Sequence, residues 1–501
     1  MQKNFDTSQH QCSDQPKFIV LCLHLQNACP PAAPPFVVAL GGKYVRSGSA
    51  PRRVVTSGGI SLLALPLVSL SMIRTLAAIA TACVTLLTAL GGDEMPGARQ
   101  STPIALTNAT VHTVTQGTIT RATVLFADGR ITAVGANVAV PQGFRVIDCS
   151  GQQVYPGFIA PVSTIGLTEI DAVRATRDMA EVGDFNPNAR GETAYNPDSD
   201  IIPTIRYNGI LLANVTPEGG IVSGMASLMR LDGWTRDDIA VKSRSALMVT
   251  WPQMDVNTAP WESRSADEQR RETGKRVDAL RELFRQAKAY ALLTSVGDTA
   301  KRDIRLEAMA RVFRDTLPVF VRASSRKQME SALDFRREFG LSMVIVGAAD
   351  APYMIDRLQK EGVGVVIRRV HALPIRDEDA YDAAYTLPAT LAAAGIPFAF
   401  SDDGGWQQRN LPFHAGTAIA YGLGADAALR SLTLTPAQML KVDADYGSIE
   451  VGKSATLFVS KGDALDARSN VVTQAFIDGR QVDLTSRHTR MTKKYRERYK
   501  R

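Results

Sequence analysis

Cysteine is scarce in this sequence. Only five cysteines occur among 501 residues, and Cys149 alone lies beyond residue 83. The chain after that point cannot form an internal disulfide bond, so a large hydrophobic core has to stabilise it. Hydrophobic residues make up 45% of the chain and charged residues 21%, which argues against wholesale disorder and against a protein with many membrane spans.

Histidine is almost as rare. The six histidines are His10, His24, His112, His371, His414 and His488. The first two precede the expected mature chain, the third falls in a predicted sheet and the last in a basic tail, which leaves two for a site. A hydrolytic metal site needs about three protein ligands, mostly imidazole, and an open position for water. The sequence therefore offers little material for such a site.

An excess of one charge sign is also missing from most of the chain. The net charge is +7, and residues 486–501 contain eight lysines and arginines against Glu497 alone, so the rest of the chain is neutral. This distribution argues against a body that binds nucleic acid. We interpret 486–501 as a basic tail, solvated or disordered, and keep a contact with anionic lipid or another polyanion as the alternative.

A basic residue, an apolar run and small residues follow one another near the N-terminus. Arg74 precedes an apolar run at 76–90, and two glycines follow it. This order is typical of a secretory signal peptide. We therefore expect the translation start at Met72, a signal peptide at 72–92, and export to the periplasm or secretion of the mature protein.

Residues 1–71 show no clean periodicity, and we expect them to be a non-native or disordered extension that packs against nothing. Two alternatives remain for the apolar run that follows. It could be a single membrane anchor, although the segment after Arg74 is short for a span of about 20 residues. Cys83 could also carry a lipid, although a polar tether does not follow it.

Short β-rich runs occur near both ends of the expected mature chain. They lie at 105–109, 122–126, 131–134, 455–459 and 472–477. The Asp-Gly pairs at 128–129 and 478–479 are typical of hairpin turns. We expect 103–152 and 447–483 to form one small β domain together.

Alternating strand-like and helix-like segments fill the middle of the chain. Strands are expected at 210–215, 317–321, 342–346, 364–367 and 397–400, and helices at 266–290, 326–339, 351–360 and 387–394. This alternation predicts a parallel sheet with crossover helices, and eight such units close into a barrel. The expected fold is α/β: a (β/α)8 TIM-like barrel at 153–446, with a small β-sandwich domain built from the N- and C-terminal segments.

Six short motifs follow one another along the chain in a characteristic order. They are Tyr-Pro-Gly-Phe-Ile at 155–159 and the segments 165–170, 219–224, 401–402, 428–437 and 446–455. In this order and spacing they cover nearly all of 103–483, and the chain resembles the amidohydrolase superfamily, especially its imidazolonepropionase-related branch. The resemblance implies hydrolysis of carbon–nitrogen bonds other than peptide bonds, with a divalent metal, zinc, as cofactor if that activity is retained.

The sequence departs from that family at the metal ligands. The family's first barrel strand ends in Asp-x-His-x-His, where this chain has Ala-Pro-Val-Ser-Thr at 160–164. The histidines that end strands five and six correspond to Arg322 and Gly347, and the aspartate of strand eight is retained as Asp402. The resemblance thus implies a degenerate metal site, to which we assign no metal ligand, and makes Asp402 the candidate general base.

Other residues could bind a substrate. Arg322, Arg368 and Arg369 are expected near the barrel mouth, where they could bind an anionic group or pair with local acidic residues. Glu169 and His371 complete the candidate substrate-binding set. A harder cation such as magnesium or calcium could be held by carboxylates, and the candidates are Asp402, Asp403, Glu169, Asp171 and Asp178.

Two hypotheses of function follow. The chain is either a hydrolase with an altered set of metal ligands, or a non-catalytic barrel that binds a small molecule or forms an oligomer with itself or with an intact amidohydrolase. We favour the second, and expect no nucleic acid and no membrane partner once the signal peptide is removed. We also expect that no two histidine rings, His371 and His414 included, come within metal-bridging distance of each other and of Asp402. No Gly-x-Ser-x-Gly motif supports a serine nucleophile.

Overall fold

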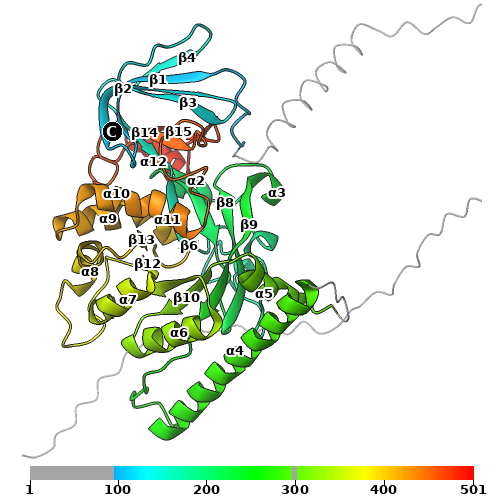
Figure 1. Ribbon diagram of the computed structural model, residues 1–501. Coiled ribbons are helices and arrows are strands. Elements are labelled where there is room, and N and C mark those ends of the chain that lie inside the picture. Colours follow the sequence, from blue (N-terminus) through cyan, green and yellow to red (C-terminus); the bar gives the residue numbers. More distant parts are fainter. Residues whose placement is uncertain (1–94, 296–301, 501) are drawn as a thin grey trace, which may run out of the picture. The chain divides into compact units, whose positions relative to one another are not determined.

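Residues 95–295 and 302–500 are described by a computed structural model of the chain. They fall within one unit, Thr88–Arg501. Two sheets of eight strands organise this unit (Figure 1). The expected signal peptide at 72–92 and the extension at 1–71 lie outside the described residues.

Eight strands form a nearly closed, barrel-like sheet. In spatial order from one edge they are β13 (Phe398–Phe400), β12 (Gly364–Ile367), β11 (Met343–Gly347), β10 (Val319–Ala323), β9 (Ala240–Thr250), β8 (Val222–Arg230), β7 (Ile210–Val215) and β6 (Phe158–Ser163). The Ser401 hydroxyl, directly after β13, donates a 2.6 Å hydrogen bond to the Val162 carbonyl in β6, which links the two edges. This mixed α/β fold is consistent with the expected TIM-like barrel.

One strand breaks the parallel pattern. β8 runs antiparallel to both β7 and β9, whereas the other neighbouring barrel strands are parallel. Short connections are sufficient on both sides of β8, because antiparallel neighbours need no crossover helix. Only the one-turn helix α3 (Arg236–Ile239) lies between β8 and β9. The chain therefore departs from a strict succession of eight strand–helix units at 216–239.

The interior of the barrel is a hydrophobic core to which every strand contributes. One cluster of buried side chains contains Ile159 of β6, Leu212 of β7, Met248 of β9 and Phe320 of β10, together with residues of the other four strands. Strands such as β7 and β11 are buried at every position, because one face fills the barrel and the other packs on helices. The core thus holds the strand ends, and the groups they carry, in fixed positions.

Helices follow the parallel strands. They are α2 (Ile201–Arg206), α4 (Ala266–Ser295), α5 (Ile304–Arg314), α6 (Arg326–Phe339), α7 (Ile355–Glu361), α8 (Ala383–Ala393), α9 (Leu411–Ala420), α10 (Ala425–Leu432) and α11 (Leu434–Met439). The helix expected at 326–339 is α6. It begins there because Ser325 and Gln328 form a capping box, and it ends there because Gly340 adopts a left-handed conformation.

A second sheet combines both ends of the described chain. Its path is β16 (Arg480–Val482), β15 (Val472–Ile477), β14 (Leu457–Ser460), β5 (Gln153–Pro156), β1 (Ile104–His112), β2 (Thr118–Ala127) and β3 (Arg130–Gly135), with β4 (Arg145–Asp148) beside β1. Antiparallel pairing of β14 with β5 joins the C-terminal strands to the N-terminal ones. Because all eight strands form one hydrogen-bonded sheet, the expected β-sandwich is not confirmed.

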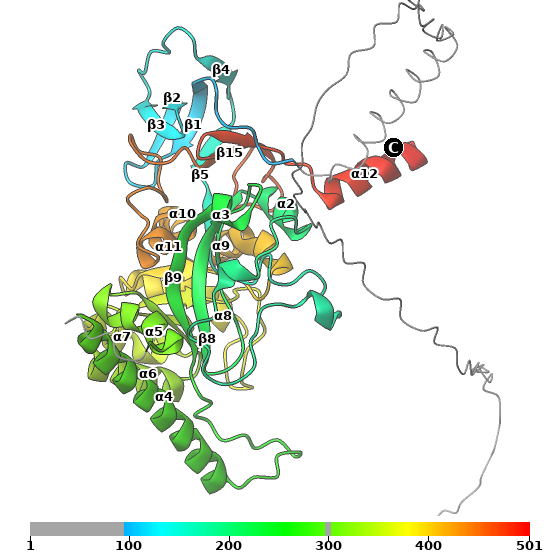
Figure 2. The same ribbon diagram turned by 90° about the vertical axis from the view of Figure 1, so that its right-hand side faces the viewer.

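The basic tail forms a helix, α12 (Arg487–Tyr499), which begins with a capping box between Ser486 and Thr489. It lies beside α2 (Figure 2). No helix in the described ranges combines the length and the apolar composition that a membrane span requires.

Candidate site at the barrel mouth

Charged side chains gather at the carboxyl ends of three parallel barrel strands, β10, β12 and β13. Arg322 is in β10, Arg368 and Arg369 directly follow β12, and Asp402 and Asp403 follow β13. Because parallel neighbours end at the same edge of a sheet, these residues share one mouth of the barrel, where catalytic groups sit in enzymes of this architecture.

Asp402 accepts hydrogen bonds at both of its carboxylate oxygens. Arg369 Nε donates to Oδ1 at 2.8 Å, the backbone N–H of Asp403 donates to the same oxygen at 2.7 Å, and His414 Nε2 lies 2.8 Å from Oδ2. The Asp402 side chain is 2% exposed. Burial raises the pKa of Asp402, but hydrogen bonds from His414 and Arg369 outweigh it and hold that pKa below its usual value. The carboxylate is therefore ionised and neutralised, and it is a weak base.

His414 is fixed by contacts on both ring nitrogens. Helix α9 holds the ring in the interior, and the backbone N–H of His371 donates to Nδ1 at 3.4 Å. A neutral His414 must then carry its proton on Nε2 and donate it to Asp402. In this hydrogen bond Nε2 of His414 is the donor and Oδ2 of Asp402 is the acceptor.

The sequence predicts that no two histidine rings come within metal-bridging distance of each other and of Asp402. One ring, that of His414, contacts Asp402 directly. His371 and His414 lie beside each other. Their ring centroids are 4.4 Å apart, and His371 Nε2 lies 2.7 Å from Thr417 Oγ1. The segment after β12 folds back over the end of the barrel and brings His371 onto α9. Burial lowers the pKa of His371, and the neighbouring His414 lowers it further.

The residues at the mouth do not fit a divalent metal. Val162 and Thr164 at the end of β6, Arg322 and Gly347 offer no imidazole, and both nitrogens of His414 are committed to other partners. Within the described ranges no group of three histidine, cysteine, aspartate or glutamate side chains could hold a metal ion. The arrangement lacks the three-ligand set that a hydrolytic zinc site needs.

Each arginine of the mouth has a carboxylate partner. Arg369 pairs with Asp402, Arg368 Nε donates to Asp403 Oδ1 at 2.7 Å, and Arg322 Nη2 lies 3.4 Å from Glu218 Oε1. Burial lowers the pKa of Arg322, and the charge of Glu218 opposes that shift. The sequence allowed two interpretations of these arginines, binding of an anionic group or pairing with local acidic residues. The structure shows the local ion pairs. Arg368 stays half exposed, so it remains accessible to a ligand.

Glu169 lies in the loop after β6, apart from this cluster of ion pairs. Its carboxylate accepts hydrogen bonds from Asn196 Nδ2 at 3.1 Å and from Ser199 Oγ at 2.9 Å, so it ties that loop together. Asp171 and Asp178 are exposed. The hypothesis of a carboxylate-rich cation site made from these residues and Asp402 is wrong, because their carboxylates do not converge.

A cavity of about 310 Å³ adjoins the charged cluster. Its wall is largely apolar, and the lining includes Gly347, Tyr353, Arg368, Leu373, Ile375 and Leu387. Sequence reasoning missed this wall. The signal that could have revealed it is the Leu-Pro-Ile run at 373–375, which places apolar side chains in an irregular segment where Leu373 is 85% exposed.

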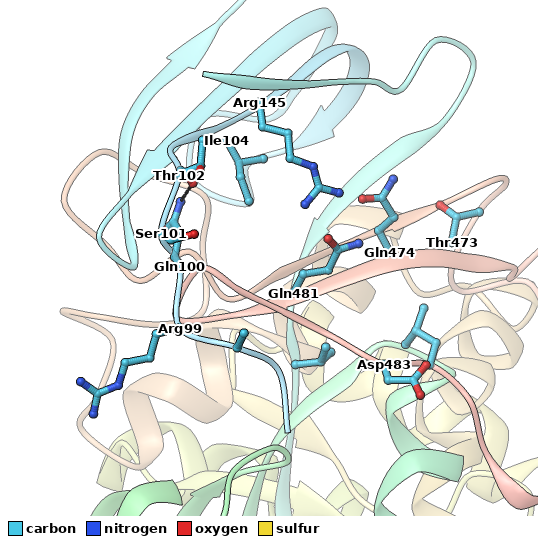
Figure 3. A pocket seen from close by; sticks show the side chains of 14 residues that line it. Arg99, Gln100, Ser101, Thr102, Ile104, Arg145, Thr473, Gln474, Gln481 and Asp483 are labelled. Carbon is cyan, nitrogen blue, oxygen red and sulfur yellow. Dashed lines mark hydrogen bonds between the residues drawn. The ribbon is translucent and has the colours of Figure 1, made fainter. Parts of the chain in front are cut away.

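A second hollow, of about 610 Å³, lies on the small sheet (Figure 3). Arg99, Arg145, Gln474 and Gln481 line it. It is larger, but it contains no end of a barrel strand and no cluster of paired charges, so we place the candidate site at the barrel mouth. Cys149 is buried in the small sheet, and this burial raises its pKa to about 11, which makes a nucleophilic thiol ineffective there.

Comparison with known proteins agrees with this architecture. Residues 339–482 match the model of the amidohydrolase family. A curated relative, amidohydrolase tasK of Hapsidospora irregularis, is 22% identical over 400 residues, which cover 71% of this chain and 39% of that protein. The chain thus spans about two fifths of the length of that relative.

A solved structure has the same fold. The amidohydrolase from Thermotoga maritima MSB8 matches with a TM-score of 0.68 and 24% identity, over 76% of this chain and 99% of that one. This likeness shows the barrel fold. Together with the family match, these findings support the amidohydrolase superfamily, while the imidazolonepropionase-related branch stays a prediction.

Proposed function

We propose that this protein binds a small molecule at the mouth of an amidohydrolase-type barrel and does not hydrolyse it by the metal-dependent route. The observation that carries the proposal is the state of Asp402, which is buried, ionised and hydrogen-bonded by Arg369 and His414. The guanidinium of Arg369 neutralises the carboxylate. It is a permanent cation that stays protonated at neutral pH, so it does not act as an acid.

The cavity beside the cluster indicates the kind of ligand. Its apolar wall, with Leu373, Ile375 and Leu387, suits an apolar group, and most small-molecule sites combine such a wall with a few placed polar groups. Arg368 lines the same cavity and is half exposed. It could exchange Asp403 for a carboxylate of the ligand, since both are planar acceptors for a guanidinium. The proposed ligand therefore has an apolar body and one anionic group.

Hydrolysis of a carbon–nitrogen bond other than a peptide bond is the second candidate function. The match of 339–482 to the amidohydrolase family favours it, and so does the buried Asp402–His414 pair. It would need a divalent metal, zinc in the first place, and the residues at the mouth do not fit one. Export of the mature protein and assembly with itself or with an intact amidohydrolase remain proposals under either function.

Metal analysis separates the two candidates. We expect purified protein, incubated with zinc and then desalted, to retain far less than one equivalent. About one equivalent of zinc that is lost in Asp402→Ala would overturn the proposal and restore the hydrolase.

A matched pair of probes tests the ligand class. N-acetyl-leucine and N-acetyl-leucinamide differ only in the anionic group, so we expect the acid alone to raise the melting temperature. Arg368→Gln should remove that difference, whereas Arg326→Gln, on the exposed face of α6, should retain it. Equal responses to acid and amide would refute the role of Arg368.

A further inference from the structure

The basic helix α12 has an outer face with no partner among the described residues. The helix contains six lysines and arginines against Glu497, and none of its residues is buried. Its start is fixed by the buried Ser486, whose hydroxyl accepts from the backbone N–H of Thr489. A surface helix of this composition is not explained by burial of an apolar face, so its charge calls for another partner.

One side of α12 contacts the body of the protein. The ring of His488 packs edge-on against Trp406 at 6.0 Å between centroids, and its Nδ1 lies 3.5 Å from Thr204 Oγ1. Arg490 lies 3.6 Å from Asp200. These contacts orient the helix. Thr489 and Thr492 line a hollow against Thr204, so the opposite side of α12, which carries Met491 and Tyr495, turns outward.

The outward side combines cations with aromatic and apolar groups. At 3.6 residues per turn, Arg487, Met491, Lys494, Tyr495 and Arg498 fall on one face. Met491 is 40% exposed and Tyr495 46%. Within the described chain neither Arg487 nor Lys494 has a carboxylate within 4.0 Å, and the Arg498 guanidinium lies over the ring of Tyr499. Since the chain before residue 486 is neutral overall, this face is a local concentration of positive charge.

We propose that this face of α12 docks on an anionic phospholipid surface. Lysines and arginines on a surface helix attract anionic headgroups, and each cation near the surface adds to the binding. Three of the six cations of α12 lie on this face. Tyrosine suits the same boundary, because its ring is apolar and its hydroxyl is polar. Thirteen residues are too few to cross a bilayer, so the helix lies in the interface plane. This proposal does not depend on the function assigned to the barrel.

The structure favours lipid over nucleic acid as the occupant. Met491 lies among the cations of this face and is 40% exposed, and an apolar side chain gains from burial at a lipid interface but not from contact with a phosphate backbone. This proposal differs from the sequence-based expectation of no membrane partner. It takes up the alternative interpretation of the basic tail, a contact with anionic lipid.

Sedimentation with vesicles tests this proposal on the full chain. We expect binding to vesicles that contain phosphatidylglycerol and much weaker binding to phosphatidylcholine alone, with a loss of binding at high salt. The triple variant Arg487→Gln, Lys494→Gln and Arg498→Gln should bind the anionic vesicles roughly a hundredfold more weakly. Tyr495→Ser should weaken binding several-fold, because it removes apolar area from the interface.

The matched control places the same charge change elsewhere. Arg271, Lys275 and Arg276 are exposed on α4, and their replacement by Gln should leave vesicle binding at the wild-type level. Circular dichroism of each variant verifies that the fold is kept. Equal loss in both triple variants, or no loss in the α12 variant, would overturn the proposal. So would tighter binding to duplex DNA than to the anionic vesicles.

Discussion

The neighbours of Asp402 determine whether its carboxylate is ionised and how strong a base it is. An aspartate at the end of the last barrel strand can act as a general base only if one oxygen is free to accept a proton. Here Arg369, His414 and the backbone of Asp403 occupy both oxygens, and the pKa of the carboxyl lies below its usual value. The group therefore stabilises the fold of the mouth, and we expect its removal to be seen in stability.

We predict that Asp402→Asn lowers the free energy of unfolding by about 2–4 kcal/mol at neutral pH. Loss of one partner of a buried ion pair costs about 3–5 kcal/mol, and the cost is lower here because Arg369 is 37% exposed and can reach water. Asp403→Asn is the matched control. Its pair with Arg368 is exposed on both sides, so it should cost about 1 kcal/mol or less. Urea unfolding followed by circular dichroism measures both.

The same pair of proteins has a defined pH dependence. Because the folded-state pKa of Asp402 is lower than the unfolded one, its stabilisation is complete above the usual carboxyl pKa of about 4 and is lost as pH falls below it. The difference between wild type and Asp402→Asn should therefore shrink in acid. A difference that grows below that pH would contradict the assigned direction.

At the scale of elements, the end of β11 has a backbone conformation that favours glycine and lies close to the end of β10. Gly347 ends β11 with φ +107°, a conformation that other residues rarely adopt. A Cβ atom there would lie 2.4 Å from Ser324 Oγ and 3.3 Å from the carbonyl oxygen of Ala323. A side chain at this position therefore requires the Ser324 hydroxyl to move and the Ala323 carbonyl to shift slightly.

Two glycine substitutions test this account of β11. Gly362, which ends α7, also has a positive φ of +61°, but no atom lies within 4 Å of a Cβ built there. We predict that Gly362→Ala costs about 1–2 kcal/mol from backbone strain alone, and that Gly347→Ala costs about 1–3 kcal/mol more because of the collision. Chemical denaturation compares the two variants. Equal losses would show that the collision relaxes freely and that a ligand could be rebuilt there.

At the scale of the whole molecule, a buried polar network joins the small sheet to the barrel. Asp478, in the turn between β15 and β16, accepts from Arg230 at the end of β8 and from the Tyr446 hydroxyl at 3.1 Å. Burial raises the pKa of Tyr446 to about 12, and the charge of Asp478 adds to that shift. The network links the two sheets in addition to a large hydrophobic cluster, which contains Ile477 of β15 as well as Phe158 of β6, so it contributes to the coupling of their unfolding.

We predict that Asp478→Asn lowers the free energy of unfolding by about 1–3 kcal/mol, because Arg230 loses its carboxylate in a partly buried position. Asparagine tolerates the left-handed backbone of this turn, so the change isolates the charge. Asp445→Asn is the control: Asp445 pairs with Arg130 of β3 near the same junction, but both are about half exposed. Calorimetry should show one transition for the wild type and a broader or divided one for Asp478→Asn alone. Identical profiles would refute the coupling.

Local sequence patterns were sufficient to predict several strands and helices of this fold. The strand at 364–367 and the helix at 326–339 have the bounds that sequence patterns indicate, because a run of β-branched residues and a capping box act over neighbouring residues. The loss of histidine from 160–164 is likewise visible in the sequence, because it concerns residue types alone.

Tertiary structure decided the rest, because it depends on residues that are far apart in the chain. His371 and His414 are 43 residues apart, and only the path of the segment after β12 brings them to Asp402. The antiparallel β8 and the single small sheet depend on which strands pair, and hydrophobic periodicity is the same for parallel and antiparallel partners. The sequence by itself determined which groups the mouth lacks, and the fold decided that Asp402 is paired with an arginine cation and hydrogen-bonded by a histidine.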